Sequence, residues 1–290
     1  MARTQAVASV VVALALAGCG RSGHIVVASK SFTEQVILGE IVAQHLERSL
    51  GVPVDRKLNL GGTLLAHEAL VGGQVDMYPE YTGTALTAVL KLPIARDAAA
   101  VEKQVRSEYR SRWNIEWLPP LGFNNTFAMV IEGGFDTLSE AARRPTGWKL
   151  GVGYEFLTRP DGLPGLIETY HLPLDGTPRS MDLGLLYQAL KQKQVDMVAG
   201  NSTDGLISAM RLKVLGDDKS YFPPYEAALA VRSAALTANP RLGPALAELT
   251  GKISTEQMRK MNYQVDGEHR PVRDVAKEFL VQIEKPLGGR

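Results

Sequence analysis

The residue types that carry out nucleophilic or metal chemistry are few in this sequence. Its one cysteine is Cys19. The five histidines are His24, His45, His67, His171 and His269. No motif places a serine or cysteine beside a base, and the HExxH, CxxC, Walker-loop and GxGxxG spacings are absent. Glu80, Asp161 and Asp204 offer carboxylates for acid–base work, but their spacing does not place them together. We therefore expect no enzyme, no metal site and no cofactor.

Aromatic residues stand instead where strands are expected to end. They are Tyr78, Tyr81, Phe127, Tyr154, Phe156, Tyr187 and Tyr225. A quaternary ammonium has no N–H to donate, so proteins recognise it by ring faces, each contributing about 0.5 to 2 kcal/mol once desolvated. Any single tyrosine of this set also fits a core position with a satisfied hydroxyl. Taken together, the set favours a cleft that binds a cation.

The elements that position these rings follow a repeated pattern. Residues 25–28 predict a buried strand, 29–33 a loop and 34–50 an amphipathic helix. The same unit recurs at residues 75–78, 150–153 and 195–199. This alternation predicts an α/β fold with mainly parallel sheets, in which ligands bind beyond the carboxyl ends of the strands.

An internal repeat locates two loops at once. Residues 69–77 match residues 189–197 at six of nine positions, with an offset of 120 residues. Polar loops rich in hydroxyl groups follow each match, at residues 78–84 and 198–205. Both loops end in residues that cap helices, which leaves other backbone N–H groups free to face an anionic group. The repeat therefore indicates two related α/β halves.

Two proline-rich segments indicate how the halves join. Residues 119–131 and 222–231 each contain Pro-Pro, an aromatic residue and then an apolar strand. Proline removes a backbone donor, so both segments should leave their sheets and cross between the halves. We expect one lobe to contain residues 24–124 and 229–290, and the other to contain residues 125–228. A cleft between two such lobes can close like a hinge.

The N-terminus predicts export. Arg3 precedes an apolar run at residues 6–17, which as a helix covers about 18 Å and is too short for a bilayer core of about 30 Å. Residues 1–18 are therefore a signal peptide. The ending Leu-Ala-Gly-Cys19 resembles a bacterial lipobox, which implies cleavage before Cys19, a lipid on its sulfur and a tether at residues 19–23. The alternative is an ordinary signal peptide with an incidental cysteine.

Composition limits the other classes of partner. The chain has 290 residues, of which 45% are hydrophobic and 22% are charged, as in ordinary globular proteins. Its formal net charge of +1 gives no bias toward nucleic acid. We expect a monomer that binds a small molecule, lies in the periplasm or on the outer face of the cell membrane, and contacts the membrane through lipid on Cys19.

Six ordered segments resemble the substrate-binding proteins of osmoprotectant ABC importers. They are residues 29–35, 78–84, 122–127, 159–162, 202–205 and 222–225. The resemblance extends from His24 to about Leu280. It implies a type II periplasmic-binding-protein fold, with two α/β domains joined by two crossover strands. It also implies capture of glycine betaine, choline, carnitine or a similar compound and its delivery to an importer permease.

The resemblance also implies roles for particular residues. Tyr81 and Tyr225 match cage tyrosines, and Phe127 stands where many members have tyrosine. A ligand carboxylate would favour the charges of Lys30 and Arg159, although an interlobe salt bridge is an equal alternative for Arg159. The expected ligand-binding set is Lys30, Tyr81, Thr84, Asn125, Phe127, Arg159, Asn201 and Tyr225. Additional cage residues are sought among Tyr78, Tyr154, Phe156 and Tyr187.

Asn201 departs from the pattern, because many members have a cage tyrosine at this position. Losing one ring should weaken cation binding by about 1 to 2 kcal/mol, roughly ten-fold, unless Tyr154, Phe156 or Tyr187 replaces it. A larger betaine such as ergothioneine, whose ring has a donor for Asn201, is one alternative ligand. A ligand-sensing lipoprotein of the same fold is an alternative function, and an enzyme on this scaffold has the least support.

Overall fold

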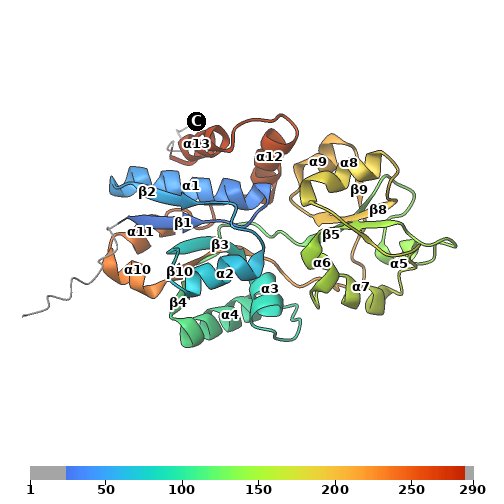
Figure 1. Ribbon diagram of the computed structural model, residues 1–290, viewed down its shortest axis with the longest axis horizontal. Helices are drawn as coiled ribbons and strands as arrows, with labels where there is room; N and C mark the ends of the chain where they lie inside the picture. Colours follow the sequence, from blue (N-terminus) through green and yellow to red (C-terminus); the bar gives the residue numbers. More distant parts are fainter. Residues whose placement is uncertain (1–23, 285–290) are drawn as a thin grey trace, which may run out of the picture.

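The computed structural model describes residues 24–284 and shows two α/β lobes side by side (Figure 1). The first lobe contains the start and the end of the described chain, and the second contains its middle. The expected signal peptide, the lipidated Cys19 and the tether at 19–23 lie outside the described residues. Within residues 24–284, no helix combines the length and apolarity that a membrane span requires.

The first lobe is built on a five-stranded sheet in the order β2-β1-β3-β10-β4. Its strands are β1 (Ile25–Ala28), β2 (Val54–Lys57), β3 (Met77–Tyr81), β4 (Ile115–Trp117) and β10 (Ala227–Arg232). Its helices are α1 (Thr33–Leu50), α2 (Thr63–Val71), α3 (Thr82–Thr84), the π-helical turn η1 (Ala85–Val89), α4 (Ala98–Trp113), α10 (Ser233–Ala238), α11 (Leu242–Ala247), α12 (Thr255–Asp266) and α13 (Val272–Glu284).

The second lobe repeats this plan with the strand order β7-β6-β8-β5-β9. Its strands are β5 (Phe127–Ile131), β6 (Leu150–Val152), β7 (Arg179–Ser180), β8 (Met197–Asn201) and β9 (Lys213–Val214). Its helices are α5 (Leu138–Ala141), α6 (Tyr154–Thr158), α7 (Leu163–Tyr170), the 3₁₀ turn η2 (Leu183–Leu185), α8 (Leu186–Lys191) and α9 (Gly205–Ala209).

The first sheet is covered by helices on both faces, as the buried side chains of β1 show. Ile25 and Val27 pack in the core beneath α1, α11, α12 and α13, whereas Val26 and Ala28 pack in the core beneath α2 and α4. Successive side chains of a strand point to opposite faces, so a strand buried on both faces reads as one apolar run. The α/β fold expected from such runs is confirmed.

One strand in each sheet runs against the other four. β10 pairs antiparallel with β3 and β4, and β5 pairs antiparallel with β8 and β9. Both strands begin directly after a crossover between the lobes, so they enter their sheets from the cleft side, where the other strands end. β10 begins at Ala227, two residues before the boundary expected at 229, because pairing with Tyr81 starts there.

The two crossover segments lie side by side. Asn124 and Glu226 form an antiparallel bridge, and the Asn125 N–H donates to the Tyr225 carbonyl at 3.0 Å. The side chain of Asn124 accepts from the Tyr225 N–H at 2.6 Å. These bonds satisfy backbone groups that have left the sheets. They also hold Asn125 and Tyr225 together at the base of the interlobe space.

A close contact between the lobes gives a test of closure. A Cβ on Gly205, the first residue of α9, would lie 2.4 Å from the backbone nitrogen of Tyr263 in α12. Neither backbone can give way locally, so we expect Gly205→Ala to open the lobes and increase the radius of gyration in small-angle X-ray scattering. Gly243→Ala is the control, since its Cβ would meet only Leu236 at 3.8 Å. Equal radii for the two variants would contradict this role of the α9–α12 contact.

Candidate functional site

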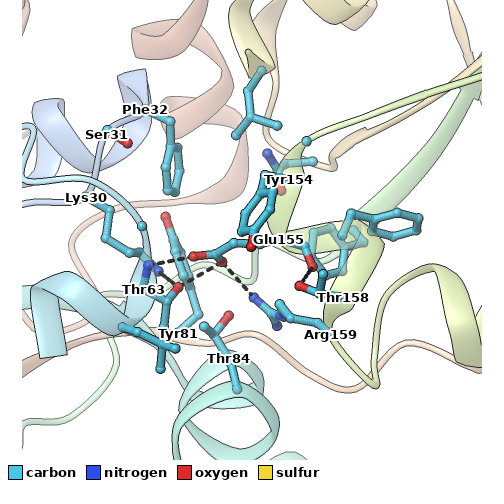
Figure 2. A pocket seen from close by; sticks show the side chains of 18 of the residues that line it. Lys30, Ser31, Phe32, Thr63, Tyr81, Thr84, Tyr154, Glu155, Thr158 and Arg159 are labelled. Carbon is cyan, nitrogen blue, oxygen red and sulfur yellow. Dashed lines mark hydrogen bonds and ion pairs between the residues drawn. The ribbon is translucent and has the colours of Figure 1, made fainter. Parts of the chain in front are cut away.

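A cleft of about 620 Å³ lies between the lobes and is lined from both of them (Figure 2). Every residue of the expected ligand-binding set lines it: Lys30, Tyr81, Thr84, Asn125, Phe127, Arg159, Asn201 and Tyr225. The first lobe contributes the β1–α1 loop, the start of α2 and the end of β3. The second lobe contributes α6 and the end of β8. The strand ends thus meet around one space.

Aromatic rings form two walls of this cleft. Tyr81 stacks on Phe32 with ring centroids 6.4 Å apart. On the other side, Phe127 packs edge-on against Tyr225 at 5.5 Å and against Phe156 at 4.9 Å. Phe32 was not among the expected cage residues, although it lies in the segment 29–35 that carries the family resemblance. Aromatic rings from both lobes therefore line one space.

The hydroxyl groups of the two main tyrosines donate to buried carboxylates. Tyr81 donates to Glu34 Oε1 at 2.7 Å, and Tyr225 donates to Asp161 Oδ2 at 2.6 Å. Burial, reinforced by these carboxylates, raises the pKa of both tyrosines well above the ordinary value. The hydroxyls therefore remain protonated donors, and a carboxylate lies beyond the polar end of each ring.

Both buried cations of the cleft, Lys30 and Arg159, are already paired within the protein. Lys30 Nζ lies 2.5 Å from Glu80 Oε1, with both side chains buried. Arg159 holds Asp161 with two bonds, Nε to Oδ1 at 2.9 Å and Nη2 to Oδ2 at 2.5 Å. Burial opposes ionisation of Arg159, but the bonds and charge of Asp161 outweigh it and raise the pKa of Arg159. This pair lies within the second lobe, so the main partner of Arg159 is not across the cleft.

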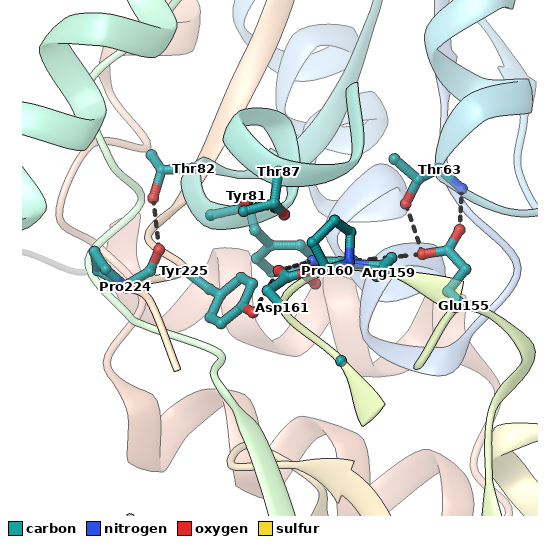
Figure 3. A network of polar contacts seen from close by, with 12 residues as sticks. Thr63, Tyr81, Thr82, Thr87, Glu155, Arg159, Pro160, Asp161, Pro224 and Tyr225 are labelled. Carbon is teal, nitrogen blue, oxygen red and sulfur yellow. Dashed lines mark hydrogen bonds and ion pairs between the residues drawn. The ribbon is translucent and has the colours of Figure 1, made fainter. Parts of the chain in front are cut away.

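A bridge between the lobes joins Glu155 of α6 to the start of α2 (Figures 2 and 3). The carboxylate of Glu155 accepts from the Thr63 N–H at 2.6 Å and from the Thr63 hydroxyl at 2.9 Å. Burial opposes the charge of Glu155, but Lys30, Thr63 and Arg159 together lower its pKa. Gly62 permits this approach, because a Cβ there would lie 2.7 Å from Glu155 Oε1.

Sequence reasoning missed two acidic groups of the site, Glu34 and Glu155. Glu155 binds Thr63, which lies 92 positions earlier in the chain and belongs to the other lobe. Glu34 is 3% exposed and takes its hydrogen-bond donors from four separate parts of the chain. Neither pairing leaves a periodic signal, so only the folded structure reveals them.

The additional cage residues separate into two groups. Phe156 and Tyr154 line the cleft, with Tyr154 73% exposed at its mouth. Tyr78 and Tyr187 do not line it, which corrects that expectation. Tyr78 precedes Tyr81 by three positions on β3 and so points to the opposite face of the sheet, into the core under α2 and α4. Tyr187 donates to Asp204 Oδ2 at 2.5 Å and lines a neighbouring cavity instead.

Asn201 lies at the end of β8, opposite Phe127 in the sheet. Its side chain lines both the cleft and the neighbouring cavity of about 320 Å³. The carboxylate of Asp204 fixes the loop that follows by accepting from the Asn201 N–H at 2.8 Å. Burial, followed by repulsion from Glu34, raises the pKa of Asp204 to about 7.

The carboxylates that could have paired for catalysis are held apart by different partners. Glu80 binds Lys30, Asp161 binds Arg159, and Asp204 accepts from Tyr187. Within residues 24–284, no group of three or more His, Cys, Asp or Glu side chains is arranged to hold a metal ion. The observed arrangement suits binding of a solute with a positive end.

Comparison with known proteins agrees with this geometry. Residues 23–282 match the model of the family described as the substrate-binding domain of ABC-type glycine betaine transport systems. A carnitine transport binding protein of Listeria monocytogenes is 33% identical over 275 residues, covering 91% of this chain and 89% of that protein. A glycine-betaine-binding protein of Pseudomonas aeruginosa is 34% identical over 280 residues, with the same coverage of each chain, 91% and 89%.

A third relative is a longer protein. It is the ergothioneine transport permease/ergothioneine binding protein of Helicobacter pylori, 33% identical over 266 residues. The match covers 89% of this chain and 47% of that protein, so the chain spans about half of its length.

The fold is also found in solved structures. A crystal structure of a glycine betaine/carnitine/choline ABC transporter matches with a TM-score of 0.74 and 31% identity, covering 89% of this chain and 98% of that chain. Apo YehZ from Escherichia coli matches with a TM-score of 0.68 and 26% identity, covering 90% of this chain and 99% of that chain. The resemblance seen in the sequence segments is thereby confirmed. This chain belongs to the family of substrate-binding domains of ABC-type glycine betaine transport systems.

Proposed function

We propose that this protein is the extracytoplasmic solute-binding component of an ABC importer and captures a quaternary-ammonium or zwitterionic solute between its lobes. The observation that carries the proposal is an aromatic cleft backed by buried carboxylates. Its tyrosines Tyr81 and Tyr225 donate to Glu34 and Asp161, and Asp161 is paired with Arg159, whereas Glu34 has no lysine or arginine partner among the described residues. The half-buried Glu155 lines the cleft itself. A cationic solute supplies the missing positive charge, and ring faces replace its hydration shell.

Closure of the two lobes is favoured by a solute that contacts both of them at once. The lobes already meet through Glu155 and Thr63, and through Glu34 and Thr203. A solute that touches Tyr81 of the first lobe and Phe127 of the second binds the closed state better than the open one. It therefore shifts the equilibrium toward closure by its difference in affinity. A permease can then recognise the closed surface.

The named ligands of the relatives, carnitine, glycine betaine and ergothioneine, share a methylated cation and a carboxylate. The carboxylate of such a ligand would take over donors that Glu155 now holds, namely Thr63 at the start of α2 and Arg159 Nη1. A larger betaine such as ergothioneine is a second candidate, because Asn201 opens the cleft toward the neighbouring cavity. Lipid anchoring through Cys19, the monomeric state and the location in the periplasm or on the outer face of the cell membrane stay predictions from the sequence.

Loss of a cage ring tests the proposal directly. Tyr81→Leu and Tyr225→Leu should each weaken choline binding about ten-fold, because leucine fills the space without a π-face. The measurement is calorimetric titration of the protein lacking residues 1–19 with choline, glycine betaine, carnitine, proline betaine and ergothioneine. Tyr109→Leu is the control, since this buried tyrosine packs against Trp113 and Trp117 in the first lobe. Wild-type protein that binds none of these compounds would refute the proposed cargo.

Arg159 should discriminate ligands that carry a carboxylate. Arg159→Lys keeps the charge, but an ammonium cannot hold Asp161 with a fork and also reach the cleft. We expect the dissociation constant for glycine betaine to rise about five-fold more than that for choline. Arg56→Lys, at a fork onto Glu47 outside the cleft, is the matched control. Equal losses for the two ligands would remove Arg159 from carboxylate recognition.

Asn201 offers a gain-of-function test. Asn201→Tyr places a ring opposite Phe127 at the end of β8, and we expect choline to bind about ten-fold more tightly. Asn201→Leu adds apolar volume at the same place without a π-face, so its affinity should stay near that of the wild type. Titration of both variants checks the expectation, and equal affinities would show that no cage position is vacant at residue 201.

A further inference from the structure

Glu34 is a buried carboxylate without a cation. Five carboxylates are buried in the described part of the chain: Glu34, Glu40, Asp76, Glu80 and Asp161. Four of them lie within 4 Å of a lysine or arginine: Glu40 of Arg56, Asp76 of Arg232, Glu80 of Lys30 and Asp161 of Arg159. Within residues 24–284, no lysine, arginine or histidine lies at ion-pair distance from Glu34.

Four hydrogen bonds hold this carboxylate in place. Oε1 accepts from the Tyr81 hydroxyl at 2.7 Å and from Asn125 Nδ2 at 2.8 Å. Oε2 accepts from the Thr203 hydroxyl at 2.5 Å and from Asn262 Nδ2 at 2.9 Å. Four donors orient a carboxylate and favour its charged form, but they do not neutralise the charge. Glu34 therefore remains in need of a positive partner.

The donors come from both lobes and from the crossover. Tyr81 and Asn262 belong to the first lobe, Asn125 to a crossover segment and Thr203 to the loop after β8 in the second lobe. Thr203 reaches Glu34 only while the lobes are together. Closure thus removes Glu34 from solvent, and burying an uncompensated charge costs free energy.

The other groups around Glu34 are acidic and increase this cost. Asp204, Asp266 and Asp182 line the same neighbouring cavity as Glu34, with Tyr187 and Asn201 between them. Burial raises the pKa of Glu34 and of Asp266, and it raises that of Asp204 to about 7. Among the described residues, the exposed Arg259 donates to the Ser202 carbonyl at 2.8 Å, beside Thr203, and His269 lowers the pKa of Asp266. No lysine, arginine or histidine of the described chain lines the cavity itself, so its acidic groups give this region a negative potential.

We propose that Glu34 is the buried counter-charge for the cation of the ligand, and that it makes closure of the lobes depend on that cation. The inference rests on the proposed capture of a quaternary ammonium. Glu34 acts through the ring of Tyr81, to which it is hydrogen-bonded, and through its field, so it is a positioning residue rather than a direct contact. Without a ligand, Glu34 can lose its charge only by taking up a proton, so a proton and the ligand cation compete for the same role.

The test compares the pH dependence of choline binding in Glu34 variants. Choline has a permanent positive charge and no group that ionises between about pH 4.5 and 8, so any pH dependence of its binding in this range comes from groups of the protein. Because the proton on Glu34 competes with the cation and its pKa is raised by burial, the affinity should fall as pH falls. Glu34→Gln should bind about ten-fold more weakly at neutral pH and lose this dependence, whereas Glu34→Asp should keep it.

Two controls isolate the effect. All variants are measured with Asp204→Asn, which removes the group that titrates near pH 7 in the same cavity. Glu40→Gln changes a buried glutamate on the same helix that already has Arg56 at 2.8 Å, and its pH profile should match that of the parent. A Glu34→Gln protein with the affinity and pH profile of its parent would overturn the proposal.

A second measurement needs no ligand. In scattering experiments on the empty protein, acidification should close the wild type, and Glu34→Gln should be more closed than the wild type at neutral pH. Unchanged dimensions of the empty Glu34→Gln protein would refute the link between charge and closure. If no methylated cation binds to the wild type, the proposed cargo fails, while this measurement still decides whether Glu34 controls closure.

Discussion

Charge buried between the lobes is the constraint on which the site depends. A carboxylate taken out of water costs free energy unless a cation or a full set of donors compensates for it. The cleft meets this need with Lys30 at Glu80 and with the fork of Arg159 on Asp161. Glu34 has donors and no cation within the described chain. The cleft is therefore complete only when it contains a further positive charge.

The two-fold plan of the fold brings these groups to one place. Four strands of each sheet end toward the cleft, and the fifth, β5 or β10, starts there because it continues from a crossover. Residues at strand ends, such as Tyr81 and Asn201, therefore face each other from different lobes. Hydrogen bonds from the Asn125 N–H to the Tyr225 carbonyl and from the Tyr225 N–H to the Asn124 side chain join the two crossovers. The same geometry makes the contacts of Glu34 sensitive to closure.

Much of this arrangement could be predicted because local signals determine it. Apolar runs predicted the strands, and the repeat and the Pro-Pro segments placed Tyr81, Asn201 and Tyr225 at one edge. Tyr78 was wrongly proposed as a cage residue, because the prediction used only its position near a strand end. Side chains alternate between the two faces of a strand, so Tyr78 and Tyr81 of β3 point to opposite faces of the sheet. The bridge from Glu155 to Thr63 was beyond sequence reasoning, since no spacing encodes a contact between residues of two lobes.

The cations that lie near the ring faces explain why the cation and the carboxylate of a ligand should contribute differently to its affinity. Lys30 Nζ already lies 4.8 Å from the centre of the Tyr81 ring, and the Arg159 guanidinium lies 5.0 Å from that of Phe127. These cations serve the carboxylates of the protein first, so a ligand carboxylate must compete with Glu80, Glu155 and Asp161 for them. At Glu34, by contrast, no lysine or arginine of the described chain is paired, so the field of this carboxylate is available to a ligand cation. The positive end should therefore dominate the affinity, and the negative end should adjust selectivity among solutes that share it.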